Sequence, residues 1–404
     1  MKMNHRTIFL SVLILLAFMV GVACNLPGIL TGESSTPPTA IVEVETSVVV
    51  ETETPEIIET VEAAADTPEP TSVPPNHGQI AFVNGGNVWL FQVDSGVSTQ
   101  VTTDGIPDSY ENSYESPQIS ADGQTLAYKK NNISYLHNLT DNTVTSLIHQ
   151  GRFFHWAATP NLFYVTLGGM ECPSLENLDD QVHIRFDVLR LDRNALDAEA
   201  VYLGSVVGGL RFAGTISNDE QWASFLNCGC YSECGAYSVM NLATSVEYSI
   251  PAEVMTGEID FSPNSQRLAV AAQQVYGYVE SPLYVANPDF SGLVPIYTEA
   301  GVAAYVPMWS PDGEWIAFTA LILGADDMTL AGSRVMVVAP DGHGLLTVES
   351  DNAELLAWSP DGSQLLYSQK TASGTSIMVY DLVSGAKNPL PISLSGNVDW
   401  GVLP

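Results

Sequence analysis

One short phrase recurs along this chain and constrains its fold more than any other feature. It consists of an apolar residue, often Trp, then a tight turn, then a β-rich run. The clearest copies are Trp309–Phe318 (Trp-Ser-Pro-Asp-Gly-Glu-Trp-Ile-Ala-Phe) and Trp358–Tyr367 (Trp-Ser-Pro-Asp-Gly-Ser-Gln-Leu-Leu-Tyr). Weaker copies begin at Ile119, Trp156, Ile216 and Phe261. A repeat of roughly 40–50 residues built from short strands is typical of radial β-sheet folds, so each copy predicts one blade of a β-propeller.

The residue types of the phrase explain its turn. In Ser-Pro-Asp-Gly, Pro presets φ near about −65° and Gly takes the left-handed conformation that returns the chain into the next strand. The runs that follow are β-branched and aromatic, as suits a pleated, half-buried surface. We expect a Trp that ends the first strand of a blade to fill the wedge between adjacent sheets.

Counting the strands predicts seven blades and a closed ring. Seven second strands can be read between Gln79 and Ser368, but the first, Gln79–Val83, has no inner strand before it. The missing strand is found at the other end, where Asn397–Trp400 places a Trp as in the clearest copies. The sequence therefore predicts an all-β, seven-bladed propeller over residues 78–404, closed by a C-terminal strand that completes the first blade. Closure removes exposed strand edges, and six or eight blades fit the count less well.

The N-terminus has the pattern of an export signal. Lys2 and Arg6 precede an apolar run from Ile8 to Ala23, which stops at Cys24. Gly21-Val-Ala-Cys24 resembles the bacterial lipobox. That resemblance implies a lipoprotein signal peptide over residues 1–23, lipidation of Cys24, membrane attachment through the N-terminal lipid and an extracytoplasmic location. A cleaved secretory signal and an uncleaved anchor are the alternatives.

Residues 24–77 read as an acidic Thr/Pro/Glu-rich linker, because they contain no Lys or Arg and too little apolar surface to fold. The whole chain has a net charge of −33 and no basic residue between Arg6 and Lys129. Phosphate binding needs clustered Lys and Arg, so this composition excludes nucleic acid as a partner. The acidity favours solubility outside the cytoplasm, and attraction of cations or basic partners is the sharper alternative.

The Ser-Pro-Asp-Gly turns followed by apolar strands resemble the TolB-type propeller repeats, which also occur in prolyl-oligopeptidase-like proteins. The resemblance covers Gly78 to the C-terminus. It implies the fold, together with roles in protein binding, envelope complexes or peptidase gating. TolB itself is six-bladed, whereas seven strand sets are read here.

No catalytic motif accompanies the repeats. Both the Gly-x-Ser-x-Gly elbow of serine hydrolases and the His-Glu-x-x-His of zinc proteases are absent from the sequence. We therefore predict neither an enzyme nor a cofactor or metal. Asp326 and Asp327 are interpreted as solvated loop acids, with a calcium site as the alternative.

Four cysteines follow Cys24, and an even number in an exported chain predicts disulfides. They are Cys172, Cys228, Cys230 and Cys234. We expect one bridge from Cys172 to the neighbouring blade and one within Cys228–Cys234. A four-thiolate metal site is the alternative.

The longest predicted loops connect second to third strands and outer to inner strands, so they share one face. They carry the residues that we expect on a binding surface: Tyr110, Glu111, Tyr114, Tyr276, Tyr278, Asp326 and Asp327. Exposed Tyr among adaptable polar residues is typical of such surfaces. We predict a monomeric module that binds a protein or peptide at the cell envelope, and the alternative is a glycan or small ligand. Carboxylates around one Arg at the channel mouth would favour that alternative.

Overall fold

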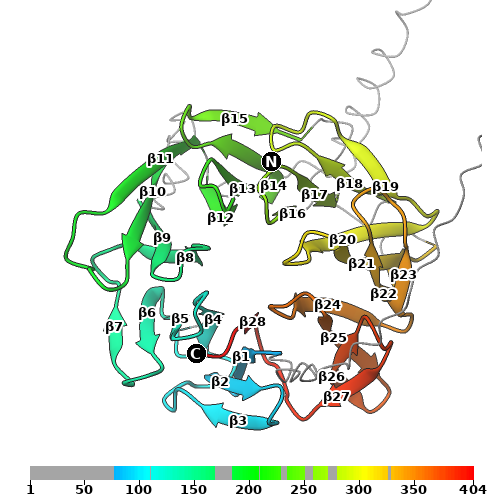
Figure 1. The fold of residues 1–404 in the computed structure, drawn as a ribbon, viewed down its shortest axis with the longest axis horizontal. Coiled ribbons are helices and arrows are strands. Elements are labelled where there is room, and N and C mark those ends of the chain that lie inside the picture. Colours follow the sequence, from blue (N-terminus) through cyan, green and yellow to red (C-terminus); the bar gives the residue numbers. More distant parts are fainter. Residues whose placement is uncertain are drawn as a thin grey trace, which may run out of the picture. The chain divides into compact units, whose positions relative to one another are not determined.

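The computed structural model describes residues 77–109, 111–168, 184–208, 210–228, 234–250, 258–271, 280–325 and 329–404. The regular structure of these residues consists of 28 strands in seven four-stranded antiparallel sheets. The sheets are arranged radially around one axis (Figure 1). No helix of the described residues is long and apolar enough to cross a membrane.

Strands are given from the innermost to the outermost of each blade. Blade 1 contains β28 (Val398–Gly401), β1 (Gln79–Asn84), β2 (Asn87–Gln92) and β3 (Val97–Gln100). Blade 2 contains β4 (Tyr114–Ile119), β5 (Thr125–Lys130), β6 (Ile133–Asn138) and β7 (Val144–Ser146). Blade 3 contains β8 (Arg152–Trp156), β9 (Leu162–Leu167), β10 (Ile184–Asp192) and β11 (Val201–Gly208). Blade 4 contains β12 (Leu210–Ile216), β13 (Trp222–Cys228), β14 (Cys234–Asn241) and β15 (Val246–Ser249).

Blade 5 contains β16 (Ile259–Phe261), β17 (Leu268–Ala271), β18 (Leu283–Ala286) and β19 (Val294–Tyr297). Blade 6 contains β20 (Val302–Trp309), β21 (Ile316–Leu323), β22 (Leu330–Val338) and β23 (Leu346–Glu349). Blade 7 contains β24 (Ala353–Trp358), β25 (Gln364–Thr371), β26 (Gly374–Asp381) and β27 (Lys387–Leu390). Seven blades are thus present, as the repeat count predicts.

The C-terminal strand closes the ring as predicted. Strand β28 lies beside β1 (Figure 1) and pairs with it antiparallel. In this pairing Trp400 is opposite Ile80. Beyond the strand, the side-chain amide of Gln79 donates hydrogen bonds to the carbonyls of Val402 (3.1 Å) and Gly123 (3.3 Å). The first blade is therefore built from the first three strands and the last strand of the described chain. Through Gln79, the C-terminal tail after β28 is linked to a turn of blade 2.

Trp residues fill the wedges between blades. Four of the inner strands end or nearly end in a Trp that is 6–8% exposed: Trp156, Trp309, Trp358 and Trp400. The indole N–H of Trp156 donates to the carbonyl of Gln118 in the preceding blade (3.0 Å), and that of Trp358 donates to the carbonyl of Met308 (3.1 Å). Each Trp packs in a cluster shared with the preceding blade, which is the position expected from the repeat.

In five of the blades, the turn after the inner strand depends on a side-chain network as well as on backbone preferences. The Ser310 hydroxyl donates to Asp312 Oδ1 (2.5 Å) and accepts the backbone N–H of Trp315 (2.9 Å), while Gly313 has φ 76°. The same Ser and Asp or Asn pairing recurs in four other blades, at Ser120, Ser217, Ser262 and Ser359. Even copies that lack Gly keep the left-handed residue, as Glu220 (φ 58°) and Ser265 (φ 61°) show. Ser and the residue two places later therefore define the turn more than Pro or Gly does.

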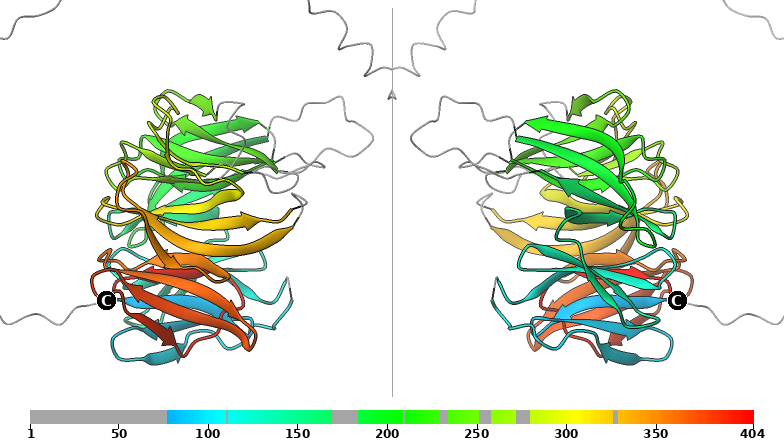
Figure 2. Two further views of the ribbon diagram at one scale, coloured as in Figure 1. Left: turned by 90° about the vertical axis from the view of Figure 1, so that its right-hand side faces the viewer. Right: turned by 90° about the vertical axis from the view of Figure 1, so that its left-hand side faces the viewer.

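The two faces of the ring differ in their connections. The short Ser-based turns lie on one face. The connections from second to third strands and from outer to inner strands lie on the other, which we call the loop face. Figure 2 shows the ring edge-on, with long hairpins extending on one side. The loop face is where the sequence placed the candidate binding residues.

Candidate binding cleft between blades 1 and 2

A cleft of about 610 Å³ lies between blades 1 and 2. Its walls come from residues 101–104 and 111–114, from β5 and β6, and from the turn before β7. The loop that joins β3 to β4 thus forms one wall, and blade 2 forms the other. Clefts of this size are typical of sites for small molecules or short peptide segments.

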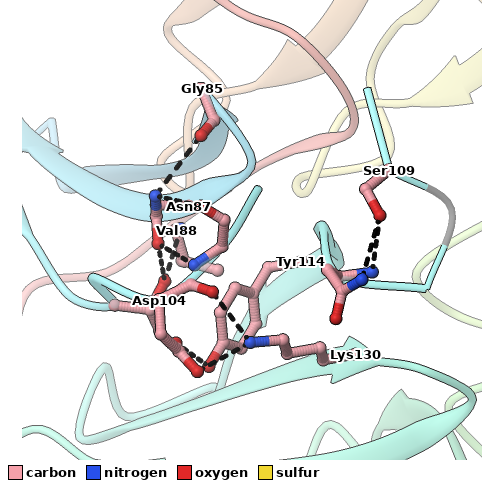
Figure 3. A network of polar contacts seen from close by, with 10 residues as sticks. Gly85, Asn87, Val88, Asp104, Ser109, Tyr114 and Lys130 are labelled. Carbon is pink, nitrogen blue, oxygen red and sulfur yellow. Dashed lines mark hydrogen bonds and ion pairs between the residues drawn. The ribbon is translucent and has the colours of Figure 1, made fainter. Parts of the chain in front are cut away.

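Asn87 holds the loop wall in place. Its Oδ1 accepts hydrogen bonds from the backbone N–H of Gly105 (2.8 Å) and from the Thr102 hydroxyl (3.2 Å) (Figure 3). Its side-chain amide donates to the carbonyls of Gly85 and Gly105, both at 3.3 Å. The Thr102 hydroxyl also accepts the N–H of Val88 at 2.9 Å. The Asn87 side chain therefore bonds backbone groups on both sides of the place where the β3–β4 loop crosses the β1–β2 turn, which we call the crossing.

The crossing is also too close for side chains. A Cβ placed on Gly105 would lie 1.9 Å from the carbonyl oxygen of Gly86, and a Cβ on Gly86 would lie 2.6 Å from the carbonyl carbon of Ile106. Gly86 has φ 78°, which further favours glycine. The N–H of Tyr114 donates to the Gly86 carbonyl at 2.9 Å. These contacts fix the loop against blade 1.

Three side chains meet at the centre of the cleft. Tyr114 donates from its hydroxyl to Asp104 Oδ1 (2.8 Å), and Lys130 Nζ donates to Asp104 Oδ2 (2.7 Å) (Figure 3). The Lys130 ammonium also lies 4.6 Å from the centroid of the Tyr114 ring. The hydrogen bonds from Lys130 and Tyr114 lower the pKa of Asp104, so this carboxylate stays ionised. Burial, followed by the bond to Asp104, raises the pKa of Tyr114, so the phenol stays protonated.

An aromatic stack forms the wall behind this centre. Tyr128 packs edge-on against Tyr114 (5.2 Å between centroids) and stacks on Tyr135 (5.8 Å). Its hydroxyl lies 3.4 Å from His137 Nδ1, and His137 Nε2 lies 2.7 Å from Asn142 Oδ1. Burial raises the pKa of Tyr128 to about 12. The wall combines aromatic faces with hydrogen-bonding side chains.

Two of the predicted binding-face residues lie in the cleft. Glu111 is exposed at its edge, whereas Tyr114 is half-buried and bonded to Asp104, and their role in binding stays a prediction. The other predicted residues lie outside the described residues: Tyr110, Tyr276, Tyr278, Asp326 and Asp327. The sequence reasoning missed Asp104 and Lys130. Lys130 did carry a signal, since it is one of few basic residues in a very acidic chain.

The cysteine predictions are only partly placed. Cys228 and Cys234 are opposite one another in the antiparallel pairing of β13 and β14. Cys24, Cys172 and Cys230 lie outside the described residues. The disulfides therefore stay a prediction, to which the backbone register adds that Cys228 and Cys234 are cross-strand neighbours.

The inner strands place a second polar set around the axis. In blades 5 and 1, an Asp immediately precedes Phe261 and Trp400, the residues at the position that Trp309 has in blade 6. Each Asp is bonded to the next blade: Asp260 Oδ2 accepts the N–H of Trp309 (2.8 Å), and Asp399 Oδ2 accepts that of Ile119 (2.7 Å). Burial raises the pKa of Asp260 to about 7 and that of Asp399 to about 6. Burial lowers the pKa of His155, at the same position of β8, to about 4.

Closer to the loop face, charged residues share one level of the inner strands. Glu115 pairs with Lys129, Arg152 with Thr166, and Glu354 with Ser368. In each second strand, this partner lies three residues after the one that pairs with the last inner-strand residue. In blade 7, for example, Leu365 pairs with Trp358, and Ser368 pairs with Glu354. Glu258 has the same level, because the N–H of Ala271 donates to its carbonyl at 3.0 Å. In the described residues, Glu115, Glu258, Glu354 and Arg152 thus occupy equivalent register positions of four inner strands.

No family model and no curated protein matches this sequence. Solved propellers are similar in structure. TolB from Acinetobacter baumannii is 13% identical, with a TM-score of 0.46, over 81% of this chain and 67% of that chain. Oligogalacturonate lyase from Vibrio parahaemolyticus is 12% identical, with a TM-score of 0.54, over 76% of this chain and 92% of that chain. Acylaminoacyl peptidase from Pyrococcus horikoshii is 9% identical, with a TM-score of 0.53, over 78% of this chain and 50% of that chain. The propeller predicted from the TolB-type repeats is confirmed as a fold, and identities this low show the fold alone.

Proposed function

We propose that this protein is a lipid-anchored, extracytoplasmic binding module that holds a protein or peptide partner on its loop face. The observation that carries the proposal is the cleft between blades 1 and 2. Its loop wall is held by the hydrogen bonds of Asn87 and by the close approach of Gly86 and Gly105. A preordered site loses less conformational freedom on binding, so more of the contact energy contributes to affinity.

The composition of the cleft suits a polypeptide. Tyr rings provide large contact areas with few rotatable bonds, and Asn and Thr provide adaptable hydrogen bonds. The proposal assigns no catalysis to the chain, in line with the missing hydrolase and metalloprotease motifs. Lipidation at Cys24, the linker over residues 24–77 and a monomeric state belong to the same proposal.

Site-specific photo-crosslinking in cells tests the binding face. A benzoylphenylalanine replaces Thr103 or Glu111, both exposed at the cleft, and in a control it replaces Val383, which is 90% exposed on a turn of the opposite face. We expect a discrete protein adduct from the cleft positions and none from Val383. Irradiation that yields no adduct from the cleft, or equal adducts from both faces, contradicts the proposal.

The equivalent inner-strand positions of Glu115, Arg152, Glu258 and Glu354 support a second candidate function, the binding of a glycan. Arg152 is exposed, and a guanidinium can hold a sugar carboxylate with two hydrogen bonds. The similar fold of oligogalacturonate lyase suggests oligogalacturonides as the first probe.

Calorimetric titration of the full chain with oligogalacturonides tests this candidate. We expect the wild-type protein to bind and Arg152→Ala to lose binding. Arg267→Ala, in the turn between β16 and β17 on the face opposite the loop face, should bind like wild type. An absence of heat with the wild-type protein would rule out this ligand class.

A further inference from the structure

We infer that the cleft between blades 1 and 2 receives a Lys- or Arg-bearing segment of the partner. This inference rests on the proposed function and specifies the chemistry of its ligand. Three independent features of the cleft support it: an internal example of a bound cation, spare anionic groups, and the electrostatic field of the ring.

Lys130 shows how this cleft holds a cation. Its ammonium is bound by the Asp104 carboxylate (2.7 Å) and the Asp104 carbonyl (3.1 Å), and it lies 4.6 Å from the centroid of the Tyr114 ring. A carboxylate beside an aromatic face is a favourable environment for an ammonium or guanidinium group. The side chains needed to bind a basic residue are therefore already assembled here.

The cleft keeps anionic capacity after Lys130 is bound. The Asp104 side chain is 69% exposed, and a carboxylate offers about four lone-pair sites, of which Tyr114 and Lys130 occupy two. Glu111 is exposed and forms no ion pair in the described part of the chain. Among the described lining residues Lys130 is the one Lys or Arg, so the cleft retains a net negative charge.

The whole ring adds to this preference. Residues 77–404 contain 36 acidic and 11 basic residues. In the part of the ring that the structure describes, five basic side chains are in ion pairs: Lys130, Arg190, Arg193, Arg334 and Lys387. A negative field of this kind accelerates the approach of basic segments and repels acidic ones. The half-buried Tyr135 on the cleft wall offers a further aromatic surface for the apolar stem of a Lys or Arg.

Peptide binding to the full-length protein in detergent tests the inference. The probes are a fluorescein-labelled Gly-Ser-Tyr peptide carrying several lysines and the same peptide with glutamines in their place. The decisive variants are Glu111→Lys in the cleft and Glu314→Lys, an exposed site on the opposite face. Both change the net charge equally, so any difference between them reports the local site.

We expect the lysine peptide to bind at least about tenfold more tightly than the glutamine peptide, and more weakly as salt rises. Reversing one charge near the bound cation should weaken binding about fivefold to tenfold in Glu111→Lys, and less than about twofold in Glu314→Lys. Equal losses in both variants, or no loss in Glu111→Lys, would overturn the inference. If Thr103 still crosslinks a partner while the glutamine peptide binds equally well, partner binding stands and the basic segment is wrong.

Discussion

Asp260 makes the stability of the ring depend on pH in a predictable direction. Its carboxyl is packed between the inner strands of blades 5 and 6, where it accepts the backbone N–H of Trp309 at 2.8 Å. Burial raises its pKa from 3.8 to about 7. The unfolded chain ionises this group near pH 4, whereas the folded ring resists ionisation until about pH 7. The protonated Asp260 carboxyl therefore makes its full contribution to the free energy of unfolding below pH 4. This contribution is lost as pH rises through 7.

The substitution Asp260→Asn should reverse this loss. Asn cannot ionise, and its carbonyl oxygen can still accept the Trp309 N–H. The shift corresponds to at most about 4 kcal/mol at 1.36 kcal/mol per pKa unit, and the partial exposure of Asp260 reduces it to about 2–4 kcal/mol. For a ring of this size, 1 kcal/mol moves Tm by about 1–2 °C, so Tm at pH 8 should rise by about 3–6 °C.

The assay is thermal unfolding of wild type and variant from pH 4 to pH 8. The difference between them is the quantity to follow. Other carboxylates with lowered pKa, such as Asp104 and Asp122, make both proteins less stable in acid. Asp351→Asn, at an exposed position, is the matched control for net charge. A difference that does not grow with pH, or an Asn variant that is less stable at pH 8, would refute the reasoning.

Four further predictions concern the C-terminal tail, the lipid anchor and the cysteines. Gly123→Ala should destabilise the ring by about 1–2 kcal/mol more than Gly313→Ala in urea unfolding. Both glycines have a left-handed φ, but only a Cβ on Gly123 would lie 2.6 Å from the Leu403 carbonyl carbon. Equal effects would mean that the tail does not fasten this turn. Deleting residues 396–404 should lower stability by at least about 3–5 kcal/mol and promote aggregation, since it removes buried Trp400 and exposes the edge of β1. An unchanged melting temperature with a monomeric product would contradict closure. Cys24→Ser should release the protein from membranes in cell fractionation, and retention would exclude the lipid anchor. Thiol titration of the denatured, unreduced protein should find no free cysteine among the four in the ring, whereas reactive thiols or bound zinc would reject the disulfides.

The candidate site was less predictable than the fold. The loop wall was recognised from its length and its Tyr and Glu content, and Glu111 and Tyr114 do line the cleft. Asp104 and Lys130 were not recognised, because their meeting depends on how the loop crosses the end of blade 1. That crossing is set by Asn87 and by a glycine contact, neither of which has a sequence signature of a binding site.

The sequence by itself determined the architecture, because the fold is local and repeated. Each turn with Ser and, two residues later, Asp or Asn is closed by hydrogen bonds over two to five residues, so each copy with this pair specifies one hairpin locally. The count of copies then required Trp400 to complete the first blade. Only the tertiary structure decided which charges meet. Asp104 and Lys130 are 26 residues apart, and Asp399 and Ile119 are 280 apart. Their environments arise from packing between blades, and burial there changes the pKa of a carboxyl in ways that residue type alone does not reveal.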